Sequence, residues 1–155
     1  FNETTRKNAL DYYKLYYLKN SVVKTVLYPN VAKTLDKLET KGIKAGIVSN
    51  KPEELVVKIL KRFGIFNFFT CVFGPESLIN MKPSSDGLLK VLSITGDMPE
   101  NSVMVGDSDT DIIAGKAAGC HTCGILYGIG DKVKLLSENA DFYIAKIDEL
   151  FNYIM

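Results

Sequence analysis

The feature that most constrains the fold is the segment from Val103 to Gly119. It begins with an apolar triplet, passes through a turn that contains Asp107, Asp109 and Asp111, and continues into an Ala-rich stretch. The triplet, bounded by glycine, predicts a buried strand, and the Ala-rich stretch predicts a closely packed helix. In open α/β sheets, ligands bind at the carboxyl ends of the strands. Because the acidic turn lies at such an end, we expect it to form part of a binding site.

The acidic turn requires a counter-charge, because three carboxylates within five residues repel one another unless a cation or a basic side chain lies among them. Oxygen ligands without His or Cys favour Mg²⁺ over a transition metal. An alternative is that Asp109 and Asp111 only complement the dipole at a helix N-terminus. That alternative leaves Asp107 unexplained, because Asp107 precedes the helix. The turn therefore predicts Mg²⁺ as the cofactor.

Composition limits the classes of protein to consider. At 155 residues, with 46% hydrophobic and 24% charged residues, the chain is expected to form one globular domain. A net charge of +1 gives no electrostatic reason to expect nucleic acid or an anionic membrane as partner. No apolar run is long enough to span a bilayer, and no signal-peptide pattern opens the chain. The three cysteines suit a reducing cytoplasm better than a disulfide framework.

Strand and helix patterns alternate along the chain. The pattern predicts strands at 43–48, 71–73, 102–105, 122–126 and 142–144, and an extended segment at 21–28. It predicts helices at 4–19, from Pro29 to Glu39, from Pro52 to Gly64, from Pro83 to Gly96, at 110–118, shortly after a Gly-rich loop (Gly124, Gly128, Gly130), and at the C-terminal end to Met155. Such alternation is typical of an α/β fold with a three-layer, Rossmann-like parallel sheet that has helices on both faces.

Two further candidate sites lie in loops. Ser49 and Asn50 follow a predicted strand and precede a helix, so a hydroxyl and backbone N–H groups can form a phosphate cradle there. The alternative is an ordinary helix cap. Lys82 stands before Pro83 and could neutralise a phosphoryl group, although an isolated lysine is usually a solvated surface residue. Each feature is weak alone, but their order along the chain is informative.

That order resembles the haloacid dehalogenase (HAD) superfamily, and most closely its phosphoglycolate-phosphatase-like branch. The resemblance rests on a strand followed by Ser-Asn, then Lys-Pro, then a strand followed by Gly-Asp-Ser-x-x-Asp and Ala-Gly-x-Ala-Ala-Gly. The Tyr-Pro-Asn-Val segment at 28–31 and the Lys-Pro-Ser-Ser-Asp-Gly segment at 82–87 also resemble that branch, which commonly has a second proline where this chain has Ser85. The resemblance covers nearly all of the chain from residue 10 onward.

The resemblance implies a role for each matching residue. Ser49 and the Asn50 backbone would hold the transferring phosphoryl group as substrate-binding residues. Lys82, a catalytic and substrate-binding residue together with Ser49, would bridge the phosphoryl group and a nucleophilic carboxylate. Asp107 would ligate Mg²⁺ directly, and Asp111 would support the metal site through water or through Lys82. These groups act as electrostatic clamps on a phosphoryl transition state.

One departure from the family pattern is large. The family's nucleophile lies in an Asp-x-Asp motif after the first strand, and no such motif follows an apolar strand before Ser49; Asp11 and Asp36 lie on predicted helices. The chain also begins at Phe1 and enters a helical pattern almost at once, which suggests a fragment or a processed chain. We therefore expect residues 1–20 to be the remnant of a helical cap and residues 21–155 to be a core domain without its first strand. In the family topology that strand is central, so its absence would open an apolar slot.

The resulting functional hypothesis is a cytoplasmic, Mg²⁺-dependent phosphatase. It would hydrolyse a small phosphorylated metabolite, a phosphoglycolate-like phosphomonoester, through an aspartyl-phosphate intermediate, and residues 1–155 alone would be inactive. Alternatives within the superfamily are a haloacid dehalogenase and a sugar-phosphate mutase. An alternative of another class is a non-catalytic phosphate-binding or truncated protein. The sequence indicates neither the substrate nor the oligomeric state.

A Cys-x-x-Cys motif at Cys120–Cys123 encloses His121, the only histidine. A metal or redox site would need further ligands that the chain lacks, so a structural role is favoured. The phenylalanines at 66, 68 and 69 are expected to pack in the core or towards the cap.

Overall fold

A computed structural model of the chain describes residues 2–20 and 22–154; the side chains of residues 14, 15 and 17–19 lie outside that description. The α-helices are α1 (Glu3–Asn20), α2 (Val31–Thr40), α3 (Glu53–Arg62), α4 (Asp86–Thr95), α5 (Asp109–Ala117) and α6 (Lys132–Ser137). The strands are β1 (Ala45–Val48), β2 (Phe69–Phe73), β3 (Val103–Gly106), β4 (His121–Ile125) and β5 (Phe142–Ile144). Short 3₁₀ helices are η1 (Phe66–Phe68), η2 (Pro75–Ser77), η3 (Pro99–Asn101) and η4 (Ile147–Asn152).

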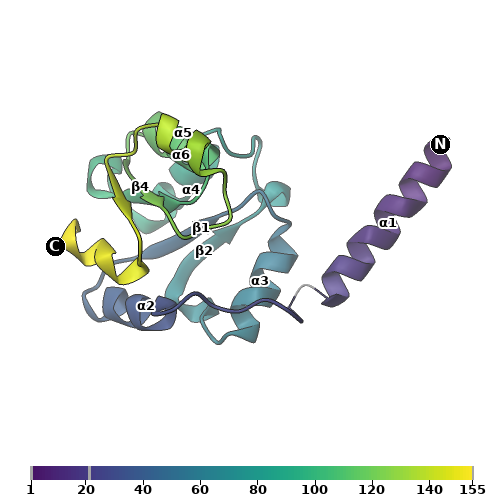
Figure 1. The fold of residues 1–155 in the computed structure, drawn as a ribbon, viewed down its shortest axis with the longest axis horizontal. Helices are drawn as coiled ribbons and strands as arrows, with labels where there is room; N and C mark the ends of the chain where they lie inside the picture. Colours follow the sequence, from purple (N-terminus) through teal and green to yellow (C-terminus); the bar gives the residue numbers. More distant parts are fainter. Residues whose placement is uncertain (1, 21, 155) are drawn as a thin grey trace.

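All strand pairings among the described residues are parallel, which confirms the predicted sheet type. The sheet is, however, divided into two parts. β1 pairs with β2, and β3, β4 and β5 form a second sheet in that order. Among residues 2–20 and 22–154, β1 and β3 therefore each have one edge without a strand partner. We call the two parts the β1–β2 side and the β3–β5 side (Figure 1).

Helices cover both faces of the strands, as the sequence predicts. On one face, buried residues of α2 and α3 pack with Ile47 of β1, while α4 and α5 pack on the other face with Val48. β3 alternates in the same way: Val103 and Val105 pack with η4 and β5, whereas Met104 packs with α4 and α5. Side chains that alternate with a period of two place each strand between two helical layers. The architecture is therefore the expected three-layer α/β fold.

Glycines end two helices where the sequence predicts stops. Gly96 follows α4 with a φ of 73°, and Gly64 lies just beyond α3 with a φ of 68°. Residues other than glycine rarely adopt this left-handed backbone conformation. The chain thus leaves each helix at the residue that can make the turn.

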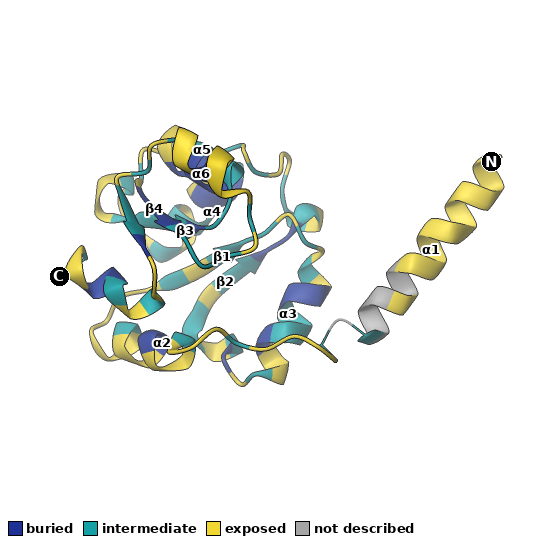
Figure 2. Ribbon diagram, in the orientation of Figure 1, coloured by how far each residue is buried: buried dark blue, intermediate teal, exposed yellow. Residues whose placement is uncertain are grey.

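α1 stands apart from the strands and their helices (Figure 1). Its described side chains are almost all exposed, including Leu10, Tyr12 and Tyr16 (Figure 2). The predicted helix at 4–19 is confirmed, although the Tyr17 and Leu18 side chains, which contributed to that prediction, lie outside the described residues. Among residues 2–20 and 22–154, no helix combines the length and apolarity that a bilayer crossing requires.

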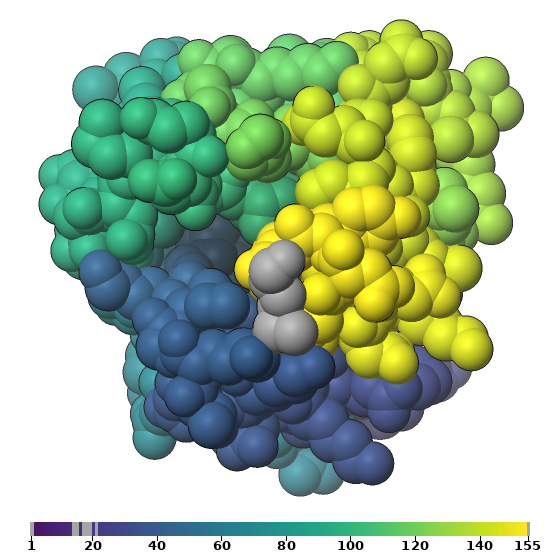
Figure 3. Space-filling model, turned by 90° about the vertical axis from the view of Figure 1, so that its left-hand side faces the viewer, coloured from purple at the N-terminus to yellow at the C-terminus, as the bar shows by residue number. Residues whose placement is uncertain are grey.

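A cavity of about 1180 Å³ separates the β1–β2 side from the β3–β5 side. All four residues of β1 and all four of β3 line it, so the two unpartnered edges lie on opposite walls. We call this cavity the central slot; Figure 3 shows its open end as a recess beside the yellow C-terminal segment. Gly46, in the middle of β1, is exposed. Strands of parallel sheets are ordinarily buried on both faces, so this exposure is unusual.

Two local predictions differ from the structure. The expected C-terminal helix is the 3₁₀ helix η4, and Met155 lies outside the described residues. Residues 22–28 join no sheet, and Ser21 lies outside the description. Their β-branched residues favour an extended chain, but a strand forms only where a neighbouring edge can accept its hydrogen bonds.

Candidate active site

An ion pair joins the Lys-Pro loop to the acidic turn. Lys82 Nζ lies 2.6 Å from Asp111 Oδ1, and the two side chains are only 11% and 7% exposed. A charge-assisted hydrogen bond of this length, sheltered from water, is among the stronger polar contacts in a protein. Lys82 comes from the loop before α4 and Asp111 from the first turn of α5, so this contact connects the two sides across the upper end of the central slot.

Asp111 is fixed by contacts on both carboxylate oxygens. Besides the Lys82 contact, its Oδ2 accepts hydrogen bonds from the Ser108 amide at 3.0 Å and the Ser108 hydroxyl at 2.7 Å. Ser108 and Asp111 form a capping box at the start of α5. Gly106 makes this approach possible, since a Cβ at that position would lie 2.3 Å from the Asp111 carboxyl carbon. Asp111 therefore both caps the helix and holds the Lys82 ammonium.

Asp107 has a different environment. Its Oδ2 accepts hydrogen bonds from the backbone N–H groups of Ile129 at 2.9 Å and Gly130 at 3.1 Å. No hydrogen bond to its Oδ1 exists among the described residues. Asp107 lines the central slot together with Lys82 and Asp111. One oxygen of this carboxylate is thus available to a ligand, whereas both oxygens of Asp111 are already engaged.

Ser49 and Asn50 lie at the carboxyl end of β1, and Asn50 bonds to the backbone of Lys82. The Asn50 side-chain amide donates to the Lys82 carbonyl at 2.9 Å, and its Oδ1 accepts from the Lys82 N–H at 3.0 Å. The Ser49 hydroxyl accepts from the Lys51 N–H at 3.1 Å. The structure therefore brings Lys82, Asp107 and Asp111 to the slot and joins Asn50 to Lys82, but Ser49 does not line the slot.

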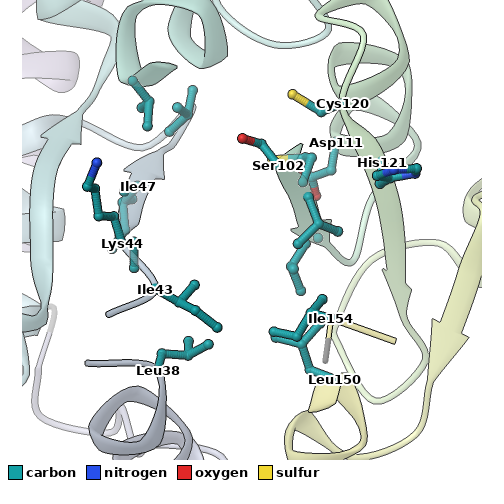
Figure 4. Close-up of a pocket in the computed structure, with 18 of the residues that line it drawn as sticks. Leu38, Ile43, Lys44, Ile47, Ser102, Asp111, Cys120, His121, Leu150 and Ile154 are labelled. Atoms are coloured by element: carbon teal, nitrogen blue, oxygen red, sulfur yellow. The ribbon is translucent and has the colours of Figure 1, made fainter. Parts of the chain in front are cut away.

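Apolar side chains face one another across the rest of the slot. Figure 4 shows Leu38 and Ile43 on one wall opposite Leu150 and Ile154 on the other. At the end remote from Lys82, the Lys44 ammonium lies 3.5 Å from Asp97 Oδ2. The slot thus has apolar walls, two strand edges that lack partners among the described residues, and the Lys82–Asp111 ion pair near the carboxyl ends of β1 and β3. This is the slot that the sequence analysis expects from the absence of a central strand.

Two tyrosines beside the site were not anticipated from the sequence. Tyr28 and Tyr127 both line the slot and contact each other edge-on, with ring centroids 5.0 Å apart. Burial, with smaller contributions from neighbouring groups that include Asp107, raises the pKa of Tyr127 to about 12. Its hydroxyl is therefore protonated at neutral pH and can donate a hydrogen bond. Tyr28 stands in the Tyr-Pro-Asn-Val segment that resembles the family, but no motif marks Tyr127 or the contact, which joins chain segments about a hundred positions apart.

The Cys-x-x-Cys motif does not form a site. Cys123 is buried in β4, Cys120 precedes the strand, and both thiols are free. Burial raises the pKa of the Cys123 thiol to about 12, so it is protonated and unreactive at neutral pH. Among the described residues, no three His, Cys, Asp or Glu side chains are grouped closely enough to hold a metal by themselves.

Comparison with known proteins identifies relatives of this chain in sequence and in fold. A profile of the haloacid dehalogenase-like hydrolase family matches residues 1–125. The chain is 40% identical over 145 residues to a phosphoglycolate phosphatase of Aquifex aeolicus, and 43% identical over 113 residues to one of Salmonella typhimurium. It also superimposes with a TM-score of 0.95, at 30% identity, on the crystal structure of a predicted phosphoglycolate phosphatase from Haemophilus somnus. The chain belongs to the haloacid dehalogenase-like hydrolase family.

The matches cover most of this chain but only part of its relatives. The Aquifex alignment covers 94% of this chain and 67% of the relative, and the Salmonella alignment covers 73% and 45%. The Haemophilus structure covers all of this chain, which corresponds to 69% of that protein. The chain therefore spans about half to two thirds of the length of these relatives.

Proposed function

We propose that this chain is the greater part of a Mg²⁺-dependent phosphatase that hydrolyses a small phosphomonoester. The observation that carries the proposal is the meeting of Lys82, Asp107 and Asp111 at one end of the slot. An ammonium group and a carboxylate with a free oxygen, at the carboxyl ends of parallel strands, suit a phosphate and its metal counter-ion. Phosphoryl transfer depends mainly on such positioning and charge neutralisation.

We propose that the central slot is the position of one further strand, supplied by residues that are not among these 155. Among the described residues, β1 and β3 each have one edge without a partner. Asn50, which follows β1, and Asp111, which follows β3, both bond to Lys82, so the carboxyl ends of the two strands lie near that lysine. A strand that runs in the same direction would complete the sheet and present its carboxyl end beside Lys82. We propose that this end supplies the nucleophilic aspartate, which residues 21–155 do not provide.

The residues present fit a magnesium ion in part. Mg²⁺ commonly binds through one or two carboxylates, substrate phosphate oxygens and several waters. Asp107 Oδ1 supplies one such oxygen, and the carboxylate of the inserted strand would supply another. Asp111 acts in support, because Lys82 and Ser108 occupy its two oxygens. When bound, the ion would withdraw charge from the phosphoryl oxygens.

The proposed chemistry proceeds in two steps. The first aspartate oxygen of the strand's Asp-x-Asp segment would form a bond to phosphorus while the ester P–O bond breaks, and the leaving alkoxide would take a proton from the protonated second aspartate of that segment. Water then hydrolyses the aspartyl phosphate and releases inorganic phosphate. During both steps, Lys82 neutralises charge between the carboxylates and the phosphoryl group, and Ser49 with the Asn50 backbone binds the phosphoryl oxygens. The names of the relatives support phosphoglycolate as the first substrate to test.

α1 is proposed to be part of a cap, as the sequence suggests for residues 1–20. It stands away from the strands and exposes Leu10, Tyr12 and Tyr16, which would be covered by further cap helices. A cap over the carboxyl ends of the strands would exclude water from the site and select the small phosphorylated metabolite. Nucleic acid and membranes are not proposed as partners, and the cytoplasm is the proposed location.

The test supplies the strand as a synthetic peptide of five apolar residues followed by Asp-x-Asp. With this peptide and Mg²⁺, the chain is expected to release inorganic phosphate from phosphoglycolate. A peptide in which the first aspartate is replaced by asparagine is the control, and EDTA should abolish turnover. Halide release from a 2-haloacid, or isomerisation of a sugar phosphate without phosphate release, would instead indicate one of the alternative enzymes. Phosphate binding without any turnover would indicate the non-catalytic alternative.

A further inference from the structure

The glycine-rich loop between β4 and α6 encloses the Asp107 carboxylate, a contact that the proposed chemistry does not use. The N–H groups of Ile129 and Gly130 converge on a single oxygen, Oδ2, at 2.9 and 3.1 Å. Asp107 belongs to the turn after β3, whereas the loop follows β4, the next strand in the sheet. Two residues more than twenty positions away in the chain thus determine how this carboxylate is oriented.

The two glycines of the loop are required by this packing. A Cβ at Gly128 would lie 2.2 Å from Asp107 Cβ, and one at Gly130 would lie 2.0 Å from the Asp107 carbonyl oxygen. Atoms cannot approach so closely, so any larger residue would push the loop away from Asp107. At Gly130 the obstacle is backbone, which cannot rotate aside as a flexible side chain would. The loop can therefore reach the carboxylate only with glycine at these positions.

We propose that residues 128–130 form a positioning clamp that holds Asp107 Oδ2 and leaves Oδ1 directed to the metal. This inference rests on the proposed function, in which Asp107 is a metal ligand. A carboxylate held on one oxygen by two N–H donors cannot rotate freely, so its other oxygen is preorganised for a cation. Hydrogen bonds of this kind to metal ligands are typically worth 10- to 100-fold in metal affinity.

The clamp should protect two backbone amides of an exposed loop from hydrogen exchange. Ile129 is 94% exposed, yet its backbone N–H donates a hydrogen bond to Asp107 Oδ2. An amide in an exposed loop ordinarily exchanges its hydrogen rapidly, whereas a hydrogen-bonded amide is protected. Protection at 129 and 130 is therefore a signature of the clamp that requires neither metal nor turnover.

The first measurement is amide hydrogen exchange of the unmodified chain by NMR. We expect the Ile129 and Gly130 amides to exchange at least about tenfold more slowly than unstructured amides, and to lose this protection in Asp107→Ala. Exchange at the unprotected rate in the unmodified chain would overturn the inference without any variant. Protection that persists in Asp107→Ala would also overturn it, because another acceptor would then hold the loop.

The second measurement is paramagnetic broadening by Mn²⁺, which prefers the same oxygen ligands as Mg²⁺. In Gly130→Ala, the Mn²⁺ concentration that broadens the amide of Asp107 is expected to rise 10- to 100-fold. The matched control is Gly124→Ala, whose Cβ would crowd the Tyr143 ring at 2.5 Å but does not touch Asp107; its Mn²⁺ affinity should change by less than about twofold. Melting temperatures of both variants separate lost stability from lost affinity.

The outcomes separate this inference from the proposed function. If Gly130→Ala binds Mn²⁺ as tightly as the control, the loop does not position Asp107, and only the inference is overturned. If Mn²⁺ broadens no amide near Asp107 even in the unmodified chain with the apolar Asp-x-Asp peptide bound, Asp107 is not a metal ligand and both proposals are overturned. If Gly130→Ala fails to fold, the exchange measurements on the unmodified chain and on Asp107→Ala decide the question.

Discussion

The two sides of the central slot differ in how their strands and site residues are held. On the β3–β5 side, β4 is hydrogen-bonded on both edges and residues 122–124 are buried, as the dark blue of β4 in Figure 2 shows. On the β1–β2 side, each strand has one partner, and Gly46 of β1 is exposed. Strands of parallel sheets are ordinarily buried on both faces. The stability of the β1–β2 side therefore depends more on what fills the slot.

The site residues follow the same division. Asp107 and Asp111 are held by groups of the β3–β5 side, namely the loop at 128–130 and Ser108. Asn50, in contrast, bonds only to the loop of Lys82, and Lys82 in turn bonds to Asp111 across the slot. The carboxylates of the site are therefore held mainly by groups of their own side. The Lys82 ammonium is held by an ion pair to the opposite side, and Ser49 is held by its backbone N–H, which donates to the Phe73 carbonyl of β2. The predictions below test this difference, beginning with the largest expected effect.

The chain alone is expected to show no phosphatase turnover with p-nitrophenyl phosphate and Mg²⁺. Both sides of the slot supply charged clamps, but neither supplies a carboxylate nucleophile opposite Lys82. The assay should follow an intact-mass measurement of the same sample. Robust turnover from material whose mass matches residues 1–155 would show that the nucleophile lies within the chain.

Asp107→Asn is expected to reduce turnover of the strand-complemented chain about a hundredfold or more, because it removes a charged oxygen from the proposed metal site. The fold should be retained, since asparagine keeps an oxygen for the Ile129 and Gly130 amides. Steady-state kinetics over a range of Mg²⁺ concentrations provide the measurement. An unchanged Mg²⁺ dependence in this variant would remove Asp107 from the metal site.

Gly106→Ala and Gly46→Ala compare the packing of the two sides directly. An Ala Cβ at 106 would meet the Asp111 carboxyl group at 2.3 Å, and Lys82 and Ser108 hold that group in place. A Cβ at 46 would meet a methyl group of Val91 at 2.7 Å, and Val91 lines the slot into which it can move.

We therefore expect Gly106→Ala to lower the free energy of unfolding by about 2–3 kcal/mol, as overpacking of a rigid site does, and Gly46→Ala by about 1 kcal/mol or less. Urea denaturation measures both. Equal losses would mean that the two sides are equally rigid, which contradicts the comparison above.

Asp141→Asn tests a long-range contact of the β3–β5 side. Asp141 Oδ2 accepts from the Thr122 N–H and hydroxyl at 2.6 and 2.7 Å, and these bonds lower the pKa of Asp141. A carboxyl with a lowered folded-state pKa stabilises the fold above its unfolded pKa of about 3.9, and that stability is lost as the pH falls through the folded value.

At pH 7 we expect the variant to be less stable by about 1 kcal/mol, a value reduced for the exposure of Asp141. The difference should shrink below about pH 4. The matched change on the other side is Asp86→Asn, whose pKa is lowered by Ser84 and Asn80. Those bonds lie within six residues of chain, so the global unfolding midpoint should move less. Thermal melts from pH 2 to 7 compare the two.

Much of this architecture could be predicted from the sequence, because the information was local. The apolar triplet before Gly106, the glycine at position 96 and the apolar run of β5 each indicate an element through neighbours in the chain. The expectation of an open slot came from the family pattern. The structure shows the sheet divided in two, since among the described residues only β2 pairs with β1 and only β4 pairs with β3.

The site was predictable in its members but not in its bonds. The resemblance allows Asp111 to act through water or through Lys82, and only the structure shows the direct Lys82–Asp111 ion pair, which depends on how α4 and α5 pack. The clamp on Asp107 comes from backbone N–H groups, which every residue carries and no motif marks. The η4 segment was expected to be a helix and is one of 3₁₀ type, a choice that its packing beneath β5 decides.

The most direct test of the slot as the place of a strand is hydrogen–deuterium exchange of the chain with and without the apolar Asp-x-Asp peptide. Bound peptide is expected to slow exchange at 45–48 and 103–106, where the unpartnered edges lie, and to leave the amides of β4 and β5 unchanged. Slowed exchange confined to other segments, or no change at either edge at saturating peptide, would contradict the assignment of the slot to a missing strand.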